Sequence, residues 1–299
     1  MIAPDLDELI ALRAAAQGLR LPSRRPSRAL HAGAHRSAHR GRGLEFQEVR
    51  PYVSGDDPRT IDWRVTARRG RPHTKLFREE RERPVWLFAD LSAAMFFGTR
   101  RQLKSSVVVR AAALIAWSAA LGGDRVGGVV AGTSSYRIIP PRAREAGVLP
   151  LLATLIDMQP TSPSAPSSAS LNDGLRALGP LVHPGSLVLA LSDFATLDES
   201  ATAAWAALAV HNDVRLFWVT DRLESEGLPD GHFRIGLPGR SMSVDGASTR
   251  AAWIGKWRER ETKIGELERH TAAPVVRLDT SEPVEEVLRT VLSGRRTAA

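Results

Sequence analysis

Acidic and hydroxyl side chains follow two apolar stretches of the sequence, where they could bind a cation. Asp90 and Ser92 come directly after the apolar run VWLFA, and Asp193 lies in the tripeptide SDF that follows the run SLVLAL. Side chains that follow the strands of a parallel sheet gather at one edge, where ligands bind. Mg²⁺ prefers six oxygen ligands, several of them water. The sequence therefore predicts a candidate metal site formed by Asp90, Ser92 and Asp193.

Apolar runs and amphipathic segments alternate along the chain from residue 85 onward, and they would position these side chains. Strands are predicted at residues 85–89, 125–132, 136–139, 186–191, 214–220 and 275–278. Helices are predicted between them at residues 102–121, 144–158, 200–210 and 249–269. Continuous apolar strands that alternate with helices are typical of a mostly parallel sheet. The predicted fold class is α/β: a doubly wound, mostly parallel sheet with helices on both faces.

The remaining segments set the predicted domain boundaries. Apolar residues at helical spacing predict a short helix over residues 5–19, whereas residues 21–43 are rich in Arg, Ser and Pro and lack periodicity. A Pro/Ser-rich loop at 159–170 and a hairpin at 233–245 interrupt the later alternation. The sequence therefore predicts an N-terminal segment at residues 1–84, the α/β domain at 85–292 and a tail at 293–299.

Composition and charge limit the classes of function. Hydrophobic residues make up 43% of the 299 residues and charged residues 25%, which is typical of a folded globular protein. The sequence has no cysteine, which excludes disulfides and thiolate chemistry. Residues 1–84 hold 18 Lys and Arg against 11 Asp and Glu, a surplus of 7 within the net charge of +8. A basic segment can bind nucleic acid, but the interleaved acidic residues argue against it.

The sequence lacks the common motifs for export, membrane insertion and catalysis. The N-terminus MIAPDLDELI carries acids where a signal peptide carries Lys or Arg. The most apolar segment, residues 107–121, is interrupted by Arg110 and Ser118 and is shorter than a membrane span. The sequence has no Gly-x-Ser-x-Gly elbow, phosphate-binding Gly-rich loop or His-Glu-x-x-His motif. We therefore expect a cytoplasmic protein that has no membrane segment and is not an enzyme.

The two acidic strand ends resemble the metal-ion-dependent adhesion site of the von Willebrand factor A domain. That site uses Asp-x-Ser-x-Ser after the first strand, a Thr from a middle loop and an Asp after the fourth strand. Asp90, Ser92 and Asp193 match three of these positions, but Ala94 replaces the second Ser and Ala169 aligns with the Thr. A methyl group cannot coordinate a metal. The resemblance therefore implies a von Willebrand factor A-like fold with a degenerate adhesion site.

Two interpretations of this site stay open from the sequence. In one, Asp90 and Ser92 serve only as turn and cap residues for the helix that follows. In the other, Ser168, Ser170 or water completes a weak site for Mg²⁺ or Mn²⁺. No other cofactor is predicted.

The segment upstream of the first predicted strand carries a second resemblance, to the bacterial domain of unknown function 58 family. The matching residues cover almost the whole segment from 33 to 80 and continue past the first strand: Gly33, His35, Ser37, Gly41, Gly43, Glu45, Phe46, Glu48, Arg50, Tyr52, Gly55, Asp56, Asp57, Arg59, Ile61, Asp62, Trp63, Ala67, Arg68, Lys75, Phe77, Glu79, Glu80, Phe97, Gly98 and Lys104. The chain resembles the family's shorter form, which lacks membrane segments. The resemblance implies association with MoxR-type AAA+ ATPases in chaperone-like assembly or activation of other proteins.

Charged and aromatic residues in this block can satisfy one another. Arginine offers a planar fork of donors that carboxylates accept. One interpretation is a structural clasp that fixes the N-terminal segment onto the α/β domain, and the other is a partner-binding surface. Both interpretations rest on the same set of residues, namely Arg50, Tyr52, Asp56, Asp57, Arg59, Asp62, Trp63 and Arg68.

Three hypotheses about function follow. The first is a non-enzymatic protein-interaction module that works with a MoxR-type AAA+ ATPase. The second is a metal-dependent enzyme that uses Asp90 and Asp193 while the basic block holds an anionic substrate. The third is nucleic-acid binding, which would weaken steeply with salt. A further pattern, His31, His35 and His39 at intervals of four, invites a metal interpretation, but Gly33 and Ser37 disfavour the helix that it needs.

Overall fold

The chain contains two compact units, which are described separately below. The computed structural model describes residues 3–22, 44–53, 56, 58–79, 83–163, 169–237 and 240–292. The α/β unit comprises Met1–Pro26 and Arg83–Ala299, and the small unit comprises Ser27–Glu82. The tail at 293–299 and the residues His31, His35 and His39 lie outside the described part of the chain.

A six-stranded sheet forms the centre of the α/β unit and confirms the predicted fold class. Its strands lie in the order β10-β7-β6-β3-β4-β5, and all neighbours are parallel except β4 and β5. The order reverses direction between β3 and β6, which makes this pair the topological switch point where ligand sites usually form. The bounds are β3 Pro84–Asp90, β4 Arg125–Ala131, β5 Tyr136–Ala143, β6 Leu187–Ser192, β7 Asp213–Thr220 and β10 Val275–Asp279.

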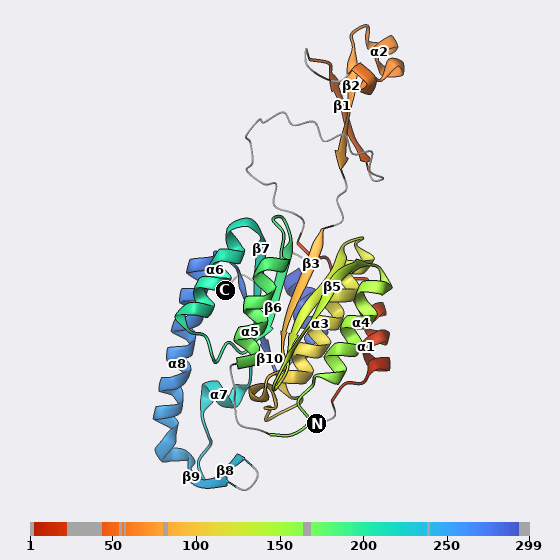
Figure 1. Cartoon of the computed structure of the whole chain (residues 1–299). Helices are drawn as coiled ribbons and strands as arrows, with labels where there is room; N and C mark the ends of the chain where they lie inside the picture. The colour runs from red at the N-terminus through yellow and green to blue at the C-terminus, as the bar shows by residue number, and fades with distance from the viewer. Residues whose placement is uncertain are drawn as a thin grey trace. The chain divides into compact units, whose positions relative to one another are not determined.

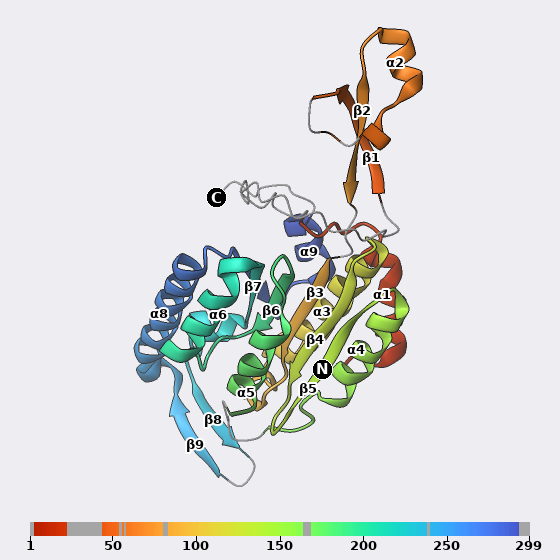
Figure 2. The same cartoon turned by 45° about the horizontal axis from the view of Figure 1, so that its top comes forward.

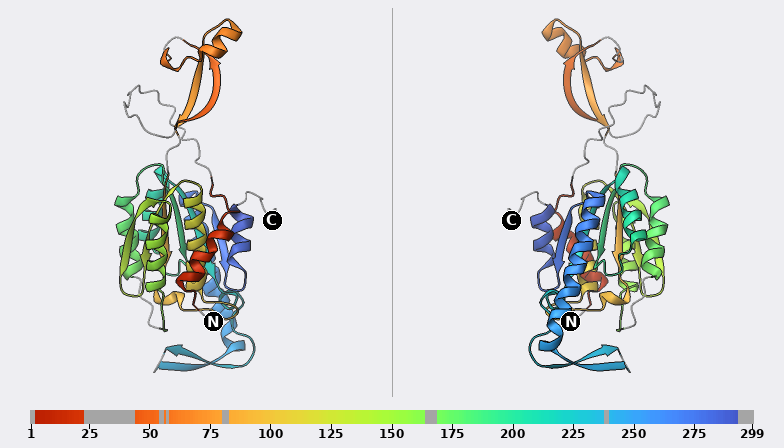
Figure 3. Two further views of the ribbon diagram at one scale, coloured as in Figure 1. Left: turned by 90° about the vertical axis from the view of Figure 1, so that its right-hand side faces the viewer. Right: turned by 90° about the vertical axis from the view of Figure 1, so that its left-hand side faces the viewer.

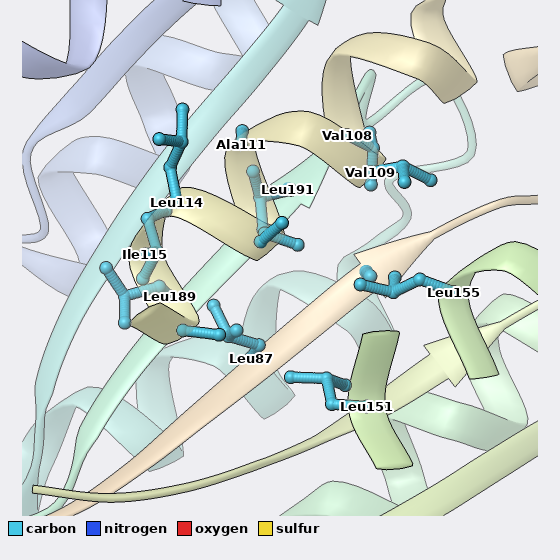
Figure 4. Packing of buried hydrophobic residues seen from close by; sticks show 14 of the residues in the cluster. Leu87, Val108, Val109, Ala111, Leu114, Ile115, Leu151, Leu155, Leu189 and Leu191 are labelled. Carbon is cyan, nitrogen blue, oxygen red and sulfur yellow. The ribbon is translucent and has the colours of Figure 1, made fainter. Parts of the chain in front are cut away.

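Helices cover both faces of this sheet (Figures 1 and 3). One layer contains α1 (Leu6–Ala16), α3 (Lys104–Leu121), α4 (Glu145–Asp157) and α9 (Val284–Leu292), and the other contains α5 (Ala169–Leu178), α6 (Glu199–His211) and α8 (Gly246–Thr271). Successive side chains of a strand point to opposite faces. Accordingly, Leu87 of β3 packs with the α3 layer whereas Phe88 packs with the other. Figure 4 shows Leu87 beside leucines of β6 and α4.

Helix α3 is the central helix of its layer. By length and composition, α3 could cross a membrane, and no other helix among the described residues could. However, 83% of the segment Lys104–Leu121 is buried inside the protein. Small and branched residues along its length allow close packing against the sheet, as Figure 4 shows for Val108, Ala111 and Ile115. Such burial is what a core helix requires.

Helix α1 belongs to the α/β unit, whereas the prediction grouped it with the N-terminal segment that ends at residue 84. Leu9 of α1 is fully buried in the core that α3 forms. The indole of Trp117 donates a hydrogen bond to the carbonyl of Leu9 at 2.9 Å, and Arg110 of α3 pairs with Glu8 at 2.6 Å. Because these contacts are made with α3, residues 1–26 cannot be grouped with the segment that follows them.

The predicted hairpin is present near the carboxyl ends of the strands. Strands β8 (His232–Leu237) and β9 (Arg240–Asp245) pair only with each other among the described residues, and they precede the long helix α8. Figure 2 shows this hairpin projecting from the α/β unit. The short helix α7 (Arg222–Glu226) follows β7, and the 3₁₀ turn η2 (Ala93–Met95) follows β3. These elements border the edge of the sheet that carries the candidate metal residues.

The small unit is an antiparallel hairpin with one short helix. Strand β1 (Leu44–Pro51) pairs with β2 (His73–Glu79), and the connection contains a 3₁₀ turn, η1 (Pro58–Thr60), and helix α2 (Trp63–Arg69). Asp62 caps the start of α2 and accepts from the backbone N–H groups of Arg64 and Val65. Gly70 ends the helix with φ +66°, a conformation that favours glycine.

Candidate functional site

Asp90 and Asp193 lie at the same edge of the sheet, as the sequence predicts. Asp90 ends β3 and is 1% exposed. Its Oδ1 accepts from the backbone N–H of Ser92 at 3.0 Å, and its Oδ2 accepts from the hydroxyl of Ser192 at 2.6 Å. Ser192 ends the neighbouring strand β6, so the parallel pairing of β3 with β6 brings these groups together. Burial, together with the charge of Asp193, raises the pKa of Asp90 to about 6.

Asp193 follows directly after β6 and faces a lysine. Its Oδ1 accepts from the backbone N–H of Ala195 at 2.9 Å, and its Oδ2 accepts from the ammonium of Lys104 at 3.1 Å. The indole of Trp218 donates to its backbone carbonyl at 3.2 Å. Although burial alone would raise it, the charge of Lys104 lowers the pKa of Asp193 below its usual value.

Lys104 also lies at this edge, although the sequence identified it only as a family match. It opens α3, and its side chain is only 2% exposed. Besides Asp193, its ammonium donates to Oε1 of Glu224 in α7 at 2.7 Å and lies 5.6 Å from the centre of the Phe97 ring. Burial alone would lower the pKa of Lys104, but the charges of Asp193 and Glu224 raise it. The sequence feature that could have indicated this buried ion pair is a lysine at the start of an apolar helix.

Ser92 and the residues that replace metal ligands complete this edge. Ser92 is buried and precedes η2, but its side chain makes no cap hydrogen bond to that turn. The hydrogen bond from Ser92 N–H to Asp90 closes a turn, as the turn interpretation of Asp90 predicts. Ala94 lies within η2, and Ala169 opens α5. Ser168 and the side chain of Ser170 lie outside the described part of the structure.

The residues present at this edge do not fit a divalent metal. An adhesion-type site needs hydroxyl and carboxylate oxygens that point into an open coordination sphere. Here Asp193 faces an ammonium, Asp90 is bonded to two protein donors, and Ala94 supplies only a methyl group. Among the described side chains, no group of three or more His, Asp or Glu residues could hold a metal ion.

In the small unit, Arg50 and Asp56 stabilise the turn that follows β1. The guanidinium of Arg50 pairs with Oδ1 of Asp56 at 2.7 Å, and Oδ2 of Asp56 accepts from the backbone N–H of Val53 at 3.0 Å. The Tyr52 hydroxyl donates to the carbonyl of Asp56 at 3.1 Å. The hydrogen bond from Arg50, followed by that from Val53, lowers the pKa of Asp56. These contacts lie within the small unit, so they hold its own shape.

Helix α2 and the turn η1 before it carry the exposed members of the predicted block. Trp63 is 70% exposed, and Arg59 and Arg68 are exposed as well. Asp62 is bound into the structure instead, because it caps α2 and its backbone N–H donates to the carbonyl of His73 at 2.8 Å. Asp57 lies outside the described residues. The structure thus separates the block into framework residues and exposed residues, which the sequence could not do.

The comparison with protein families identifies the chain. The pattern of the family described as "Protein of unknown function DUF58" matches residues 48–253, more than half of the sequence. This chain belongs to the DUF58 family. The matched range begins in β1 of the small unit and includes the edge where Asp90 and Asp193 lie. The resemblance predicted from the N-terminal block is therefore confirmed.

Relatives of this DUF58 protein include uncharacterized proteins from Mycobacterium tuberculosis and Mycobacterium bovis. Each is 34% identical over 167 residues, which are 56% of this chain and 51% of the relative. The chain thus spans about half the length of these curated relatives.

Two solved structures resemble the α/β fold of this DUF58 protein. One is a conserved hypothetical protein BatB from Bacteroides thetaiotaomicron, with 16% identity and a TM-score of 0.43 over 71% of this chain and 97% of that one. The other is a von Willebrand factor type A protein from Catenulispora acidiphila, with 10% identity and a TM-score of 0.42 over 74% of this chain and 43% of that one. The von Willebrand factor A-like fold itself rests on the strand order and the single antiparallel edge strand described above.

Proposed function

We propose that this DUF58 protein is a non-enzymatic protein-interaction module and that the exposed face of α2 is its partner-binding surface. The observation that carries the proposal is the exposure of Trp63, whose side chain is 70% exposed at the start of α2. Tryptophan and arginine are the residues most often found at the energetic centres of protein interfaces. Binding of a partner to α2 would remove the exposed indole of Trp63 from water, which favours association.

The arginines beside Trp63 give this surface its charge. Arg64, Arg68 and Arg69 are exposed on α2, whereas Asp62 is turned to the backbone of the same helix as its cap. The acid is thereby neutralised in part by the helix N-terminus, and the exposed side chains of α2 itself are basic or apolar. This arrangement favours a partner with an acidic surface around an apolar pocket.

Several contacts hold α2 in place on the hairpin. The hydroxyl of Thr66 accepts from the backbone N–H of His73 at 3.0 Å, and Ile61 forms a bridge with Thr74. Asp62 caps one end and Gly70 ends the other. A surface presented by a rigid framework loses less conformational freedom on binding than a flexible segment would. These contacts give α2 a defined position within the small unit, which supports the proposal that it presents a binding surface.

The partner that we propose is a MoxR-type AAA+ ATPase, in the chaperone-like assembly or activation of other proteins that the family resemblance implies. In this role the DUF58 protein is cytoplasmic and supplies a docking surface rather than a catalytic group.

The test is equilibrium binding to the purified MoxR-type ATPase encoded in the same genome. The variants are Trp63→Ala and Arg68→Glu, and the matched control is Val210→Ala, because Val210 on α6 of the other unit is also 70% exposed. We expect both α2 variants to bind at least about tenfold more weakly, as loss of a central interface residue does, with no change in thermal stability. Unchanged binding by both α2 variants would overturn the proposal.

A further inference from the structure

We propose that the ammonium group of Lys104 is the resident cation of the edge where β3 and β6 end, and that this edge is assembled without a divalent metal. The inference concerns the α/β unit and is independent of the α2 surface. It starts from one geometric fact: Lys104 Nζ lies 3.1 Å from Asp193 and 2.7 Å from Glu224 in a place where its side chain is 2% exposed.

Every carboxylate oxygen at this edge already has a protein donor. Both oxygens of Asp90 are bonded, to Ser92 and Ser192. Those of Asp193 accept from Ala195 N–H and from Lys104. The oxygens of Glu224 also have donors. Oε1 accepts from Lys104 and from Arg260, and Oε2 accepts from the backbone N–H of Asp221 at 3.0 Å. A metal ion at this edge would compete with these donors, and at Asp193 and Glu224 it would compete with the ammonium of Lys104.

Two positive side chains, Lys104 and Arg260, pair with the carboxylates of Asp193 and Glu224 at this edge. A buried ammonium is stable only when it is paired and hydrogen-bonded, and Asp193, Glu224 and the face of the Phe97 ring provide this. Arg260 adds a second positive charge at Glu224, 2.9 Å away. A divalent ion placed among these carboxylates would lie beside the ammonium and be repelled by it.

The position of Lys104 in the chain explains how it reaches this place. The backbone N–H of Lys104 donates to the carbonyl of Phe97 at 2.7 Å, which closes the loop between β3 and α3. The loop therefore directs the first side chain of α3 toward the end of β6. The same loop contains Ala94, where an adhesion site would supply a hydroxyl. The loop that supplies a methyl group at Ala94 is thus the loop that places the ammonium of Lys104 at this edge.

A consequence for recognition follows. In adhesion-type sites a metal can bridge the domain to a carboxylate of the partner, whereas here both carboxylates that face Lys104 belong to the protein. A partner that binds at this edge would therefore contact the surrounding loops, and its binding would be insensitive to a chelator.

Manganese titration of the full-length protein, followed by electron paramagnetic resonance, tests the proposal. We expect the free-ion spectrum to persist at millimolar Mn²⁺, and the melting temperature Tm to be equal in Mg²⁺ and in EDTA. Binding of Mn²⁺ by the wild type that disappears in Asp193→Asn would overturn the proposal.

Removal of the ammonium gives a second, independent test. Lys104→Met keeps an unbranched side chain that is one atom shorter but leaves Asp193 and Glu224 without their shared cation, so we expect Tm to fall by roughly 10 °C. The matched control is Lys263→Met, because Lys263 is exposed on α8 and its removal should leave Tm unchanged. Addition of Asp193→Asn to Lys104→Met should restore part of the loss. A Lys104→Met variant as stable as the wild type would contradict the assignment.

Discussion

The ammonium of Lys104 lies 2.7 Å from Oε1 of Glu224, although the two residues are 120 positions apart in the sequence. Glu224 also accepts from Arg260, and its other oxygen accepts from the backbone N–H of Asp221. One carboxylate therefore connects the start of α3, the short helix α7 and the long helix α8. The candidate metal edge therefore carries an ion-pair network of Asp193, Lys104, Glu224 and Arg260.

Replacing Glu224 with Gln should destabilise the protein markedly. The amide cannot pair with the charges of Lys104 and Arg260, and loss of one partner in a buried ion pair costs about 3 kcal/mol or more. Glu226→Gln is the control, since Glu226 pairs with Arg222 where both side chains are exposed and water screens the charges, so its loss should change stability little. Urea unfolding of both variants measures the difference. Equal losses would contradict the role of Glu224.

Stability should depend on pH through Asp90. Because its pKa in the folded protein is raised to about 6, the folded state binds this proton more tightly than the unfolded state does. The contribution of Asp90 to the stability of the folded protein therefore falls as the pH rises from the ordinary pKa of an aspartate to about 6. The pKa of Asp193 is lowered, so its contribution to stability is lost as the pH falls. We expect the stability of Asp90→Asn relative to wild type to increase between pH 4 and pH 7. Parallel curves for the two proteins would contradict this.

The packing of α1 on the α/β unit predicts unequal effects for two adjacent residues. Leu9 is fully buried whereas Ile10 is 39% exposed. Leu9→Ala leaves a cavity against α3 and should cost about 2 to 5 kcal/mol, whereas Ile10→Ala should cost much less. The free energy of unfolding of each variant, measured by urea titration of the α/β unit's transition, checks this. A similarly small loss of unfolding free energy in both variants would contradict the packing of Leu9 in the core.

Asp62 should control the stability of α2 without contributing directly to partner contact. Asp62→Ala removes an N-cap and should destabilise the helix by about 1 kcal/mol. Hydrogen exchange at the amides of α2 would be faster in this variant and unchanged in Trp63→Ala. Asp62→Asn retains a side-chain oxygen that can cap, so exchange in that variant should stay close to wild type. Unchanged exchange in Asp62→Ala would exclude the capping role.

The sequence predicted the sheet well because buried parallel strands have a distinct pattern. Runs such as SLVLAL are too short for helices and too continuous for a half-exposed strand. The long helix predicted at residues 249–269 is α8, which spans Gly246–Thr271. The hairpin β8–β9 was predicted from its turn residues and lies where expected, beginning one residue earlier.

Other elements could not be predicted from local patterns. Strands β1 and β2 have few continuous apolar residues, and helices α5, α7 and α9 are short, so none of them was predicted. The place of α1 depends on contacts with Trp117, which lies 108 residues away from Leu9. The role of Lys104 depends on Asp193 and Glu224, which lie 89 and 120 residues further along the chain. Such pairings arise only when the whole chain is folded.

Hydrogen–deuterium exchange of the complex with the MoxR-type ATPase tests the central claim most directly. The claim is that Trp63 and its neighbours on α2 form the partner-binding surface. We predict new protection over residues 58–71 when the partner is added, and none when the Trp63→Ala variant is used at the same concentration. Protection confined to the loops around Asp90 and Asp193, with α2 unaffected, would contradict the account.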